Sequence, residues 1–312
     1  MNGALWTILA AILVQPSSEP VPALQAAGSS AEATLERAWE RGFAKARANS
    51  TDIGPKVDHS TFENPWIVRT KNYEVRMAGS RSRAAGLAEA AESMLKLYEG
   101  LAGQARKGRD PLRIDVMPTN DLYRQYGDDH SDTRSSIFGG FFDPNNPGGA
   151  AAIEADRNAV LTRMYVTHAT AQQFLYEVSG GRDLQAALTQ GFGAYMQSFW
   201  DYSYFVNQFE ANRDAGRLLD LGELLSTPID GFGDRAMIRL NQLAMTFVYL
   251  RVIKPETRST MNGNTLVEAG PFDEYVRKAI KGESLAGDLV FKLLSEDTAA
   301  LQKEILEFRG WR

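Results

Sequence analysis

Two halves of the chain follow different hydrophobic periodicities, and this division limits the possible folds more than any other feature. Strand-like segments are confined to residues 66–155, whereas the segments from about residue 158 onward show the spacing of helices. We therefore expect an α+β protein, in which a subdomain with a small mixed or antiparallel sheet precedes a mainly helical part.

The first half alternates short strands with helices. The turn-rich sequence DPNNPGG at residues 143–149 separates two short apolar runs, which predicts a hairpin. The elements expected here are a helix over 29–49, strands within 66–77 that are split near residues 71–72, a helix over 81–101, a strand at 112–117, a helix beginning at 119–126, and hairpin strands at 138–142 and 150–155.

The second half is expected to be entirely helical. Glycines and prolines separate its apolar stripes, which predict helices near 159–179, 184–200, 203–215, 234–253, 272–281 and 298–308. We divide the chain into an N-terminal helix and linker (28–65), an α/β subdomain (66–158) and a helical subdomain (159–312).

The first residues are typical of a secretory signal peptide. An apolar run from Ala4 to Val14 is too short to span a bilayer, and prolines and small residues follow it. We expect a signal peptide over residues 1–27 and an exported, periplasmic or extracellular protein. No later stretch of the mature chain is long and apolar enough to cross a membrane.

Composition excludes several classes of function. The 312 residues carry a formal charge of −5, which argues against a nucleic-acid partner. Cysteine is absent, so neither a thiolate nucleophile nor a cysteine-bound metal is possible. The three histidines, His59, His130 and His168, allow few metal sites or catalytic triads.

One pair of neighbouring helices carries the functional argument. His168 and Gln172 are four residues apart and share a helix face, and Ala169 lies beside that face. Gln190 follows on the next predicted helix, and a turn near Gly180 could bring it over the same place. The three polar side chains could then bond to one another by hydrogen bonds.

This layout resembles the gluzincin zinc metallopeptidases, in particular their bacterial "peptidase MA-like" branch. That branch has a helix reading like HEATHQF and a second one like WLxEGLAEY, where this chain has HATAQQF and ALTQGFGAY. The order of the flanking elements is also similar over roughly residues 66–310. The resemblance implies a zincin-like fold for the helical part.

Carried over by position, the resemblance implies a site that has lost its zinc ligands and its general base. His168 matches the first zinc ligand, Ala169 the general-base glutamate, Gln172 the second ligand and Gln190 the third. A catalytic zinc needs three protein ligands and an open position for water, and a neutral amide oxygen is a weak donor for it. General-base help alone is worth about 10²–10⁴-fold in rate. We therefore expect no catalytic residues and no zinc cofactor.

The resulting hypothesis is a pseudopeptidase that binds a peptide, a glycan or an envelope protein. The aromatic residues Tyr195, Trp200, Tyr202 and Tyr204 are candidates for the wall of a binding cleft, although burial in a core also explains such a cluster. The alternatives are a divergent metal-dependent hydrolase with relocated ligands, and a structural module with filled space around His168.

Two further segments contain residues that could form a site. Residues 128–132 (DDHSD) gather acids and a histidine that could bind a divalent cation, but a solvated loop is the commoner meaning of such a run. His59 falls in a polar linker, where we expect it to be exposed to solvent.

Overall fold

A computed structural model of the chain describes residues 37, 39–42, 44, 58–108, 110–130, 138–144, 149–155, 158–228, 233–254, 260–262, 265–268, 271–283 and 298–311. The expected signal peptide lies outside these residues. In the part of the chain that is described, no helix combines the length and the apolar character needed to cross a bilayer.

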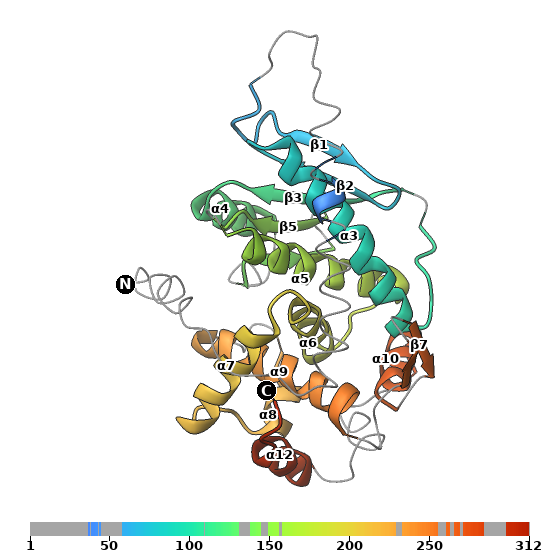
Figure 1. Cartoon of the computed structure of the whole chain (residues 1–312), viewed down its shortest axis with the longest axis vertical. Helices are drawn as coiled ribbons and strands as arrows, with labels where there is room; N and C mark the ends of the chain where they lie inside the picture. The colour runs from blue at the N-terminus through green and yellow to red at the C-terminus, as the bar shows by residue number, and fades with distance from the viewer. Residues whose placement is uncertain are drawn as a thin grey trace.

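A five-stranded mixed sheet forms the upper part of the molecule (Figure 1). The three inner strands are parallel, and the two outer strands run antiparallel to their neighbours. In the order in which they lie across the sheet, the strands are β1 (Trp66–Arg69), β2 (Tyr73–Met77), β3 (Leu112–Met117), β5 (Ala150–Ile153) and β4 (Gly140–Phe142).

Two long helices pack against this sheet, α3 (Arg81–Ala102) on β1 and β2, and α5 (Ala159–Val178) on β4 and β5. Alternate residues of β2, Tyr73, Val75 and Met77, are buried, as expected for a strand with one face in the core. The shorter helix α4 (Asn120–His130) contacts β3 and β5.

Local sequence sets the ends of α3. The side chain of Ser80 accepts a hydrogen bond from the backbone N–H of Arg83, which satisfies one free donor of the first turn. At the other end Gly103 adopts a left-handed conformation with φ of 66°, which stops the helix.

Helix α5 is buried over most of its circumference, because it lies between the sheet and helix α6 (Ala186–Gln197) (Figure 1). Every residue from Thr162 to Leu175 is buried. Because this part of α5 does not reach water, its threonine, glutamine and histidine side chains must form their hydrogen bonds inside the protein.

The remaining helices form the lower part of the molecule (Figure 1). Helix α9 packs against both α6 and α7, and α8 contacts α6 and α12. These elements are α7 (Tyr202–Asp214), α8 (Leu221–Ser226), α9 (Ala236–Val248), the π-helical turn η3 (Tyr249–Ile253), α10 (Pro271–Lys281) and α12 (Thr298–Glu307).

The α+β class is confirmed, as are the strands at 66–77 and 112–117 and the hairpin formed by β4 and β5. The described residues between 37 and 44 are helical, as expected. The prediction of an entirely helical second half is wrong: β6 (Thr260–Asn262) and β7 (Thr265–Glu268) form an antiparallel hairpin. Each strand has at most four residues, too few for an alternating pattern to stand out against helical spacing.

Candidate functional site

The candidate site lies where α5 and α6 pack against each other. The two helices are joined by a tight connection in which Gly180 and Gly181 both have positive φ angles, 73° and 77°. Such a conformation is strained for residues with a side chain, so the two glycines allow the chain to reverse. The reversal brings α6 back along α5.

The three polar residues that the sequence singled out meet at one point. The Nε2 atom of His168 lies 2.9 Å from Oε1 of Gln190 and 3.0 Å from Nε2 of Gln172. The expectation that the three side chains meet is therefore confirmed for each amide against the imidazole. We call His168, Gln172 and Gln190 the amide–histidine cluster.

Gln172 also connects the cluster to the sheet. Its Oε1 accepts a hydrogen bond of 3.1 Å from the backbone N–H of Phe142 in the outer strand β4. This contact fixes the orientation of the amide, so that its NH₂ group points to His168. The amide–histidine cluster thus joins α5, α6 and the edge of the sheet.

A neutral imidazole cannot satisfy both amides at the same nitrogen. The NH₂ group of Gln172 can only donate to Nε2 of His168, whereas Oε1 of Gln190 can only accept from it. A single ring nitrogen carries either a hydrogen or a lone pair, so one contact at a time is a full hydrogen bond.

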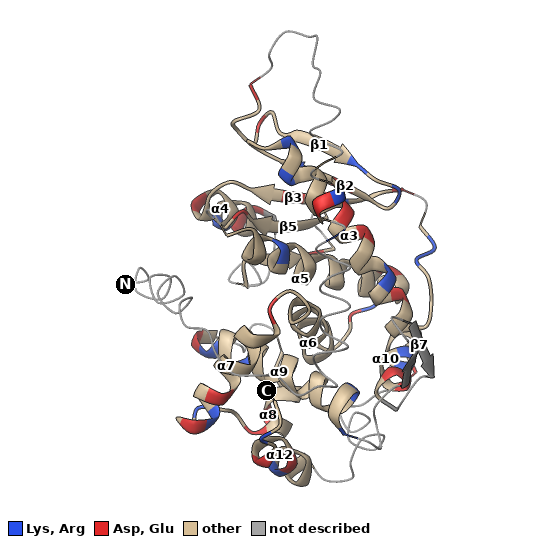
Figure 2. Ribbon diagram, in the orientation of Figure 1, with Lys and Arg blue, Asp and Glu red and all other residues tan. Residues whose placement is uncertain are grey.

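The cluster is buried and electrically neutral. His168 is 0% exposed, Gln190 3% and Gln172 5%. Burial lowers the pKa of His168 to about 4, although hydrogen bonds with Gln190 and Gln197 oppose the shift. The imidazole is therefore uncharged at neutral pH. Charged residues are concentrated on the outer helices, and α6 has none (Figure 2).

The donor set does not fit a zinc ion. A catalytic zinc takes histidine nitrogens and carboxylate oxygens, whereas this cluster has one nitrogen and two neutral amides. Ala169, which is fully buried, places a methyl group where the resembled motif has its general base. Among the described residues, no three or more His, Cys, Asp or Glu side chains are grouped so as to hold a metal ion.

Gly193 of α6 is a part of the site that the sequence analysis missed. A Cβ atom at this position would lie 2.8 Å from Nδ1 of His168, closer than real contacts allow. The imidazole therefore packs directly on the α6 backbone. Glycine within a predicted helix costs about 1 kcal/mol relative to alanine, and this cost was the signal that could have identified Gly193.

Buried hydrogen bonds hold the α5 segment beside the cluster. The hydroxyl of Tyr98 on α3 donates to the backbone oxygen of Thr167, at 3.1 Å. The indole N–H of Trp200 donates to Oγ1 of Thr167, at 2.7 Å. Trp200 is therefore a core residue with a satisfied polar atom.

Tyr195 belongs to a buried polar network on the other side of α6. Its hydroxyl accepts a hydrogen bond of 2.7 Å from Nη1 of Arg251, and Nε of Arg251 lies 3.1 Å from Asp273. Burial by itself would lower the pKa of Arg251, but Tyr195 and Asp273 outweigh it, so that the pKa is raised. No sequence pattern pointed to Arg251 or Asp273, which are separated from Tyr195 by more than fifty residues.

The four aromatic residues considered for a cleft wall occupy different environments. Tyr195 and Trp200 are buried, and only Tyr202 and Tyr204 on α7 are partly open to solvent. Any wall that they contribute to is therefore restricted to the surface of α7.

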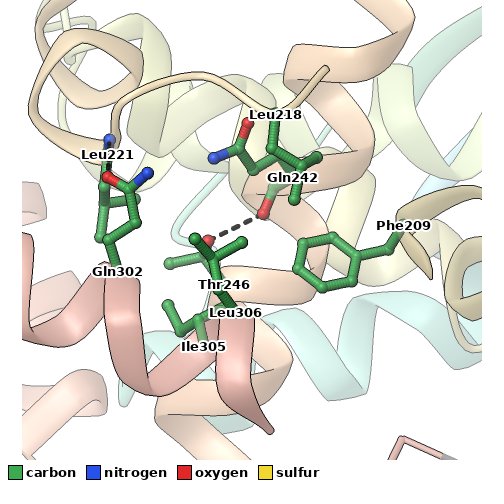
Figure 3. A pocket seen from close by; sticks show the side chains of 8 residues that line it. All are labelled: Phe209, Leu218, Leu221, Gln242, Thr246, Gln302, Ile305 and Leu306. Atoms are coloured by element: carbon green, nitrogen blue, oxygen red, sulfur yellow. Dashed lines mark hydrogen bonds between the residues drawn. The ribbon is translucent and has the colours of Figure 1, made fainter. Parts of the chain in front are cut away.

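A small pocket lies away from the cluster, among α7, α8, α9 and α12 (Figure 3). Its two amide side chains are already hydrogen-bonded to the backbone. Oε1 of Gln242 accepts a hydrogen bond from the N–H of Leu219, and Oε1 of Gln302 accepts one from the N–H of Leu221. The lining residues are Phe209, Leu218, Leu221, Gln242, Thr246, Gln302, Ile305 and Leu306. This pocket therefore offers mainly apolar walls and shares no lining residue with the cluster.

Among their described residues, the two remaining candidate segments show no catalytic arrangement. His59 is half-buried rather than fully exposed, because its ring stacks on Trp66 with centroids 3.7 Å apart. Asp128 and Asp129 are exposed at the end of α4, and residues 131–132 of the acidic run lie outside the described part.

Comparisons of the chain with protein-family models, with curated proteins and with solved structures give no match. The likeness to gluzincins therefore rests on the sequence pattern.

Proposed function

We propose that this chain is an exported, catalytically degenerate gluzincin-like protein that acts by binding a peptide, a glycan or a protein partner in the cell envelope. The observation that carries the proposal is the amide–histidine cluster. Both amides lie within 3.0 Å of Nε2 of His168, so the three side chains converge as ligands would, but they offer no negative charge. A divalent cation would have to lose its hydration without a carboxylate to compensate it.

The cluster supports a structural role at the position that the resembled peptidases use for catalysis. It links α5, α6 and β4 through contacts of 2.9–3.1 Å, and all three of its residues are buried. A partner would therefore bind elsewhere on the surface, and the partly exposed Tyr202 and Tyr204 are the aromatic candidates.

The alternative is a divergent metal-dependent hydrolase with relocated ligands. It would need a donor group that includes residues outside the described part, since the described ones provide none. The acidic run at residues 128–132 is the segment that such a site would involve.

Metal analysis of the mature chain distinguishes these functions. The protein is loaded with excess zinc, desalted without chelator and measured by mass spectrometry of its metal content. We expect far less than one zinc per chain. One zinc per chain would contradict the proposal, and the matched His168→Ala variant would then locate it: zinc that is retained in this variant is held by relocated ligands.

A further inference from the structure

The two faces of the sheet differ in character. In β2 the core-facing residues alternate with Glu74 and Arg76, which are only partly buried and point to the other face. Asp115 of β3 lies on the same face as Arg76, because the two are paired in register, and Tyr126 of α4 donates to it at 3.0 Å. We call this side of the inner and outer strands the charged face, which consists of Ile67, Arg69, Glu74, Arg76, Arg113 and Asp115.

In one row across the charged face, every cation has a carboxylate partner. Arg69 of β1, Glu74 of β2 and Arg113 of β3 are direct neighbours in the strand register. Nε of Arg69 lies 2.5 Å from Oε2 of Glu74. Arg113 reaches along its own strand and donates from Nε and Nη2 to the two carboxylate oxygens of Asp115, at 2.8 and 2.7 Å. Such bidentate pairs are the stronger form of ion pair.

The next row lacks one carboxylate. Arg76 of β2 is paired with Asp115 of β3, but the β1 residue opposite Arg76 is Ile67. Nη1 of Arg76 lies 3.7 Å from Oδ1 of Asp115, too far for a hydrogen bond, and the guanidinium carbon lies 5.7 Å from the ring centre of Phe62. Arg76 is therefore a cation that no carboxylate among the described residues binds by a hydrogen bond.

The charged face is basic, although the protein is acidic. Strands β1, β2 and β3 and the turn between β1 and β2 carry four basic and two acidic side chains, a net charge of +2, whereas the whole chain has −5. Ile67 is 54% exposed and the side chain of Arg76 23%, so a ligand can reach both. Cβ atoms of opposite residues on antiparallel strands are about 5 Å apart, so a carboxylate that lies over Ile67 is within reach of Arg76.

We propose that the charged face binds an acidic peptide, one of whose carboxylates lies over Ile67 and pairs with Arg76. This carboxylate supplies the acceptor that Arg76 lacks and completes the alternation of charge in the second row. The exposed aliphatic surface of Ile67 packs against the methylene groups of the same acidic side chain. The inference rests on the proposed binding function and names the chemical class of the partner, but it does not involve the amide–histidine cluster.

Fluorescence anisotropy of a labelled peptide tests this surface. The probe is an acetylated and amidated peptide of alternating glutamate and valine, and the same peptide with glutamine in place of glutamate is the control probe. The full mature chain should bind the glutamate probe saturably, with an affinity that falls as salt is added, and should bind the glutamine probe at least about tenfold more weakly. Equal binding of the two probes, or no binding of the glutamate probe, would overturn the proposal.

Two substitutions remove the site in different ways. Arg76→Gln removes the cation, and Ile67→Glu supplies the missing carboxylate from the chain itself, so each should weaken binding of the glutamate probe at least about fivefold. The matched controls are Lys71→Gln, which removes an equal charge from the turn, and Met237→Glu, which adds an equal charge at an exposed apolar position of α9. Each control should change the affinity less than about twofold. Controls that weaken binding as much as the two site variants would mean that only the overall charge is recognised, and the proposal would be wrong.

The thermal transition of Ile67→Glu provides a second readout, which also decides the matter if Arg76→Gln does not fold. Because its carboxylate pairs with Arg76, Ile67→Glu should have a higher Tm than the wild type, whereas Met237→Glu should not. A Tm of Ile67→Glu that is unchanged or lower would show that a carboxylate over position 67 does not reach Arg76, which contradicts the proposal. One zinc per chain in the metal analysis would instead contradict the pseudopeptidase function and leave the peptide titration unchanged.

Discussion

The imidazole of His168 lies 2.9 Å from the amide oxygen of Gln190, although the two residues are 22 positions apart and belong to different helices. The contact depends on a glycine turn that reverses the chain and on Gly193, which lets the ring approach the backbone of α6.

Restoring the three altered positions should create a zinc site. Gln172 and Gln190 both contact Nε2 of His168, so Ala169→Glu, Gln172→His and Gln190→Glu together would supply three ligands and a base. We expect about one zinc per chain and a higher Tm with zinc than without it. The double variant that retains Ala169 is the matched control: it should bind zinc equally well, because residue 169 is not a ligand. A triple variant that folds but takes up no zinc would show that the positional matching is incorrect.

Removing the amide of Gln190 should destabilise the protein. Gln190→Leu leaves Nε2 of His168 to accept from Gln172 and places the ring hydrogen on the buried Nδ1, which has no hydrogen-bond partner, and an unsatisfied buried polar group costs about 1–3 kcal/mol. The free energy of unfolding, measured by urea denaturation, should fall by that amount. Thr189→Ala, at the half-buried neighbouring position, should change it by less than about 1 kcal/mol. Equal effects of the two substitutions would argue against a structural role for the cluster.

A methyl group at position 193 should destabilise the folded protein. Alanine is normally preferred to glycine in a helix by about 1 kcal/mol, but here the Cβ atom would lie 2.8 Å from Nδ1 of His168. We expect Gly193→Ala to lower the free energy of unfolding by about 1–3 kcal/mol through overpacking. Gly100→Ala is the control, because it lies on α3 with no atom within 4 Å of its added Cβ, and it should stabilise the protein. If both substitutions stabilise the protein, the ring is not packed on α6 as described.

Acidification should reveal the buried neutral histidine. Burial lowers the pKa of His168 from 6.5 to about 4, so between these values the unfolded chain binds a proton that the folded chain does not. The resulting loss in the free energy of unfolding is negligible well above pH 6.5, grows as the pH falls and is complete below pH 4. It amounts to about 3 kcal/mol in total.

The comparison with His168→Gln isolates this contribution. This variant has no titrating group at position 168, so its free energy of unfolding should lose less between pH 7.5 and pH 4.5 than that of the wild type. We expect the difference between the two proteins to change by about 2–3 kcal/mol over this range. A difference that does not change with pH would mean that His168 titrates normally.

The sequence was sufficient to predict the elements that local patterns encode. The alternation in residues 112–117 and the turn composition at 143–149 each depend on near neighbours, and each corresponds to a feature of the structure. The shared helix face of His168 and Gln172 was likewise fixed by helical geometry. In contrast, the hairpin of β6 and β7 was missed, because its strands are too short for a clear period.

What the sequence determined by itself was therefore which side chains can share a face and that these side chains carry no charge. Only the tertiary structure decided that Gln190 reaches His168, that Phe142 donates to Gln172, and that Tyr195 and Trp200 are buried. These relations join segments between about 20 and 60 residues apart. The physical reason is that they depend on how the helices and the sheet pack, and no local periodicity records the distance between two elements that meet only when the core forms.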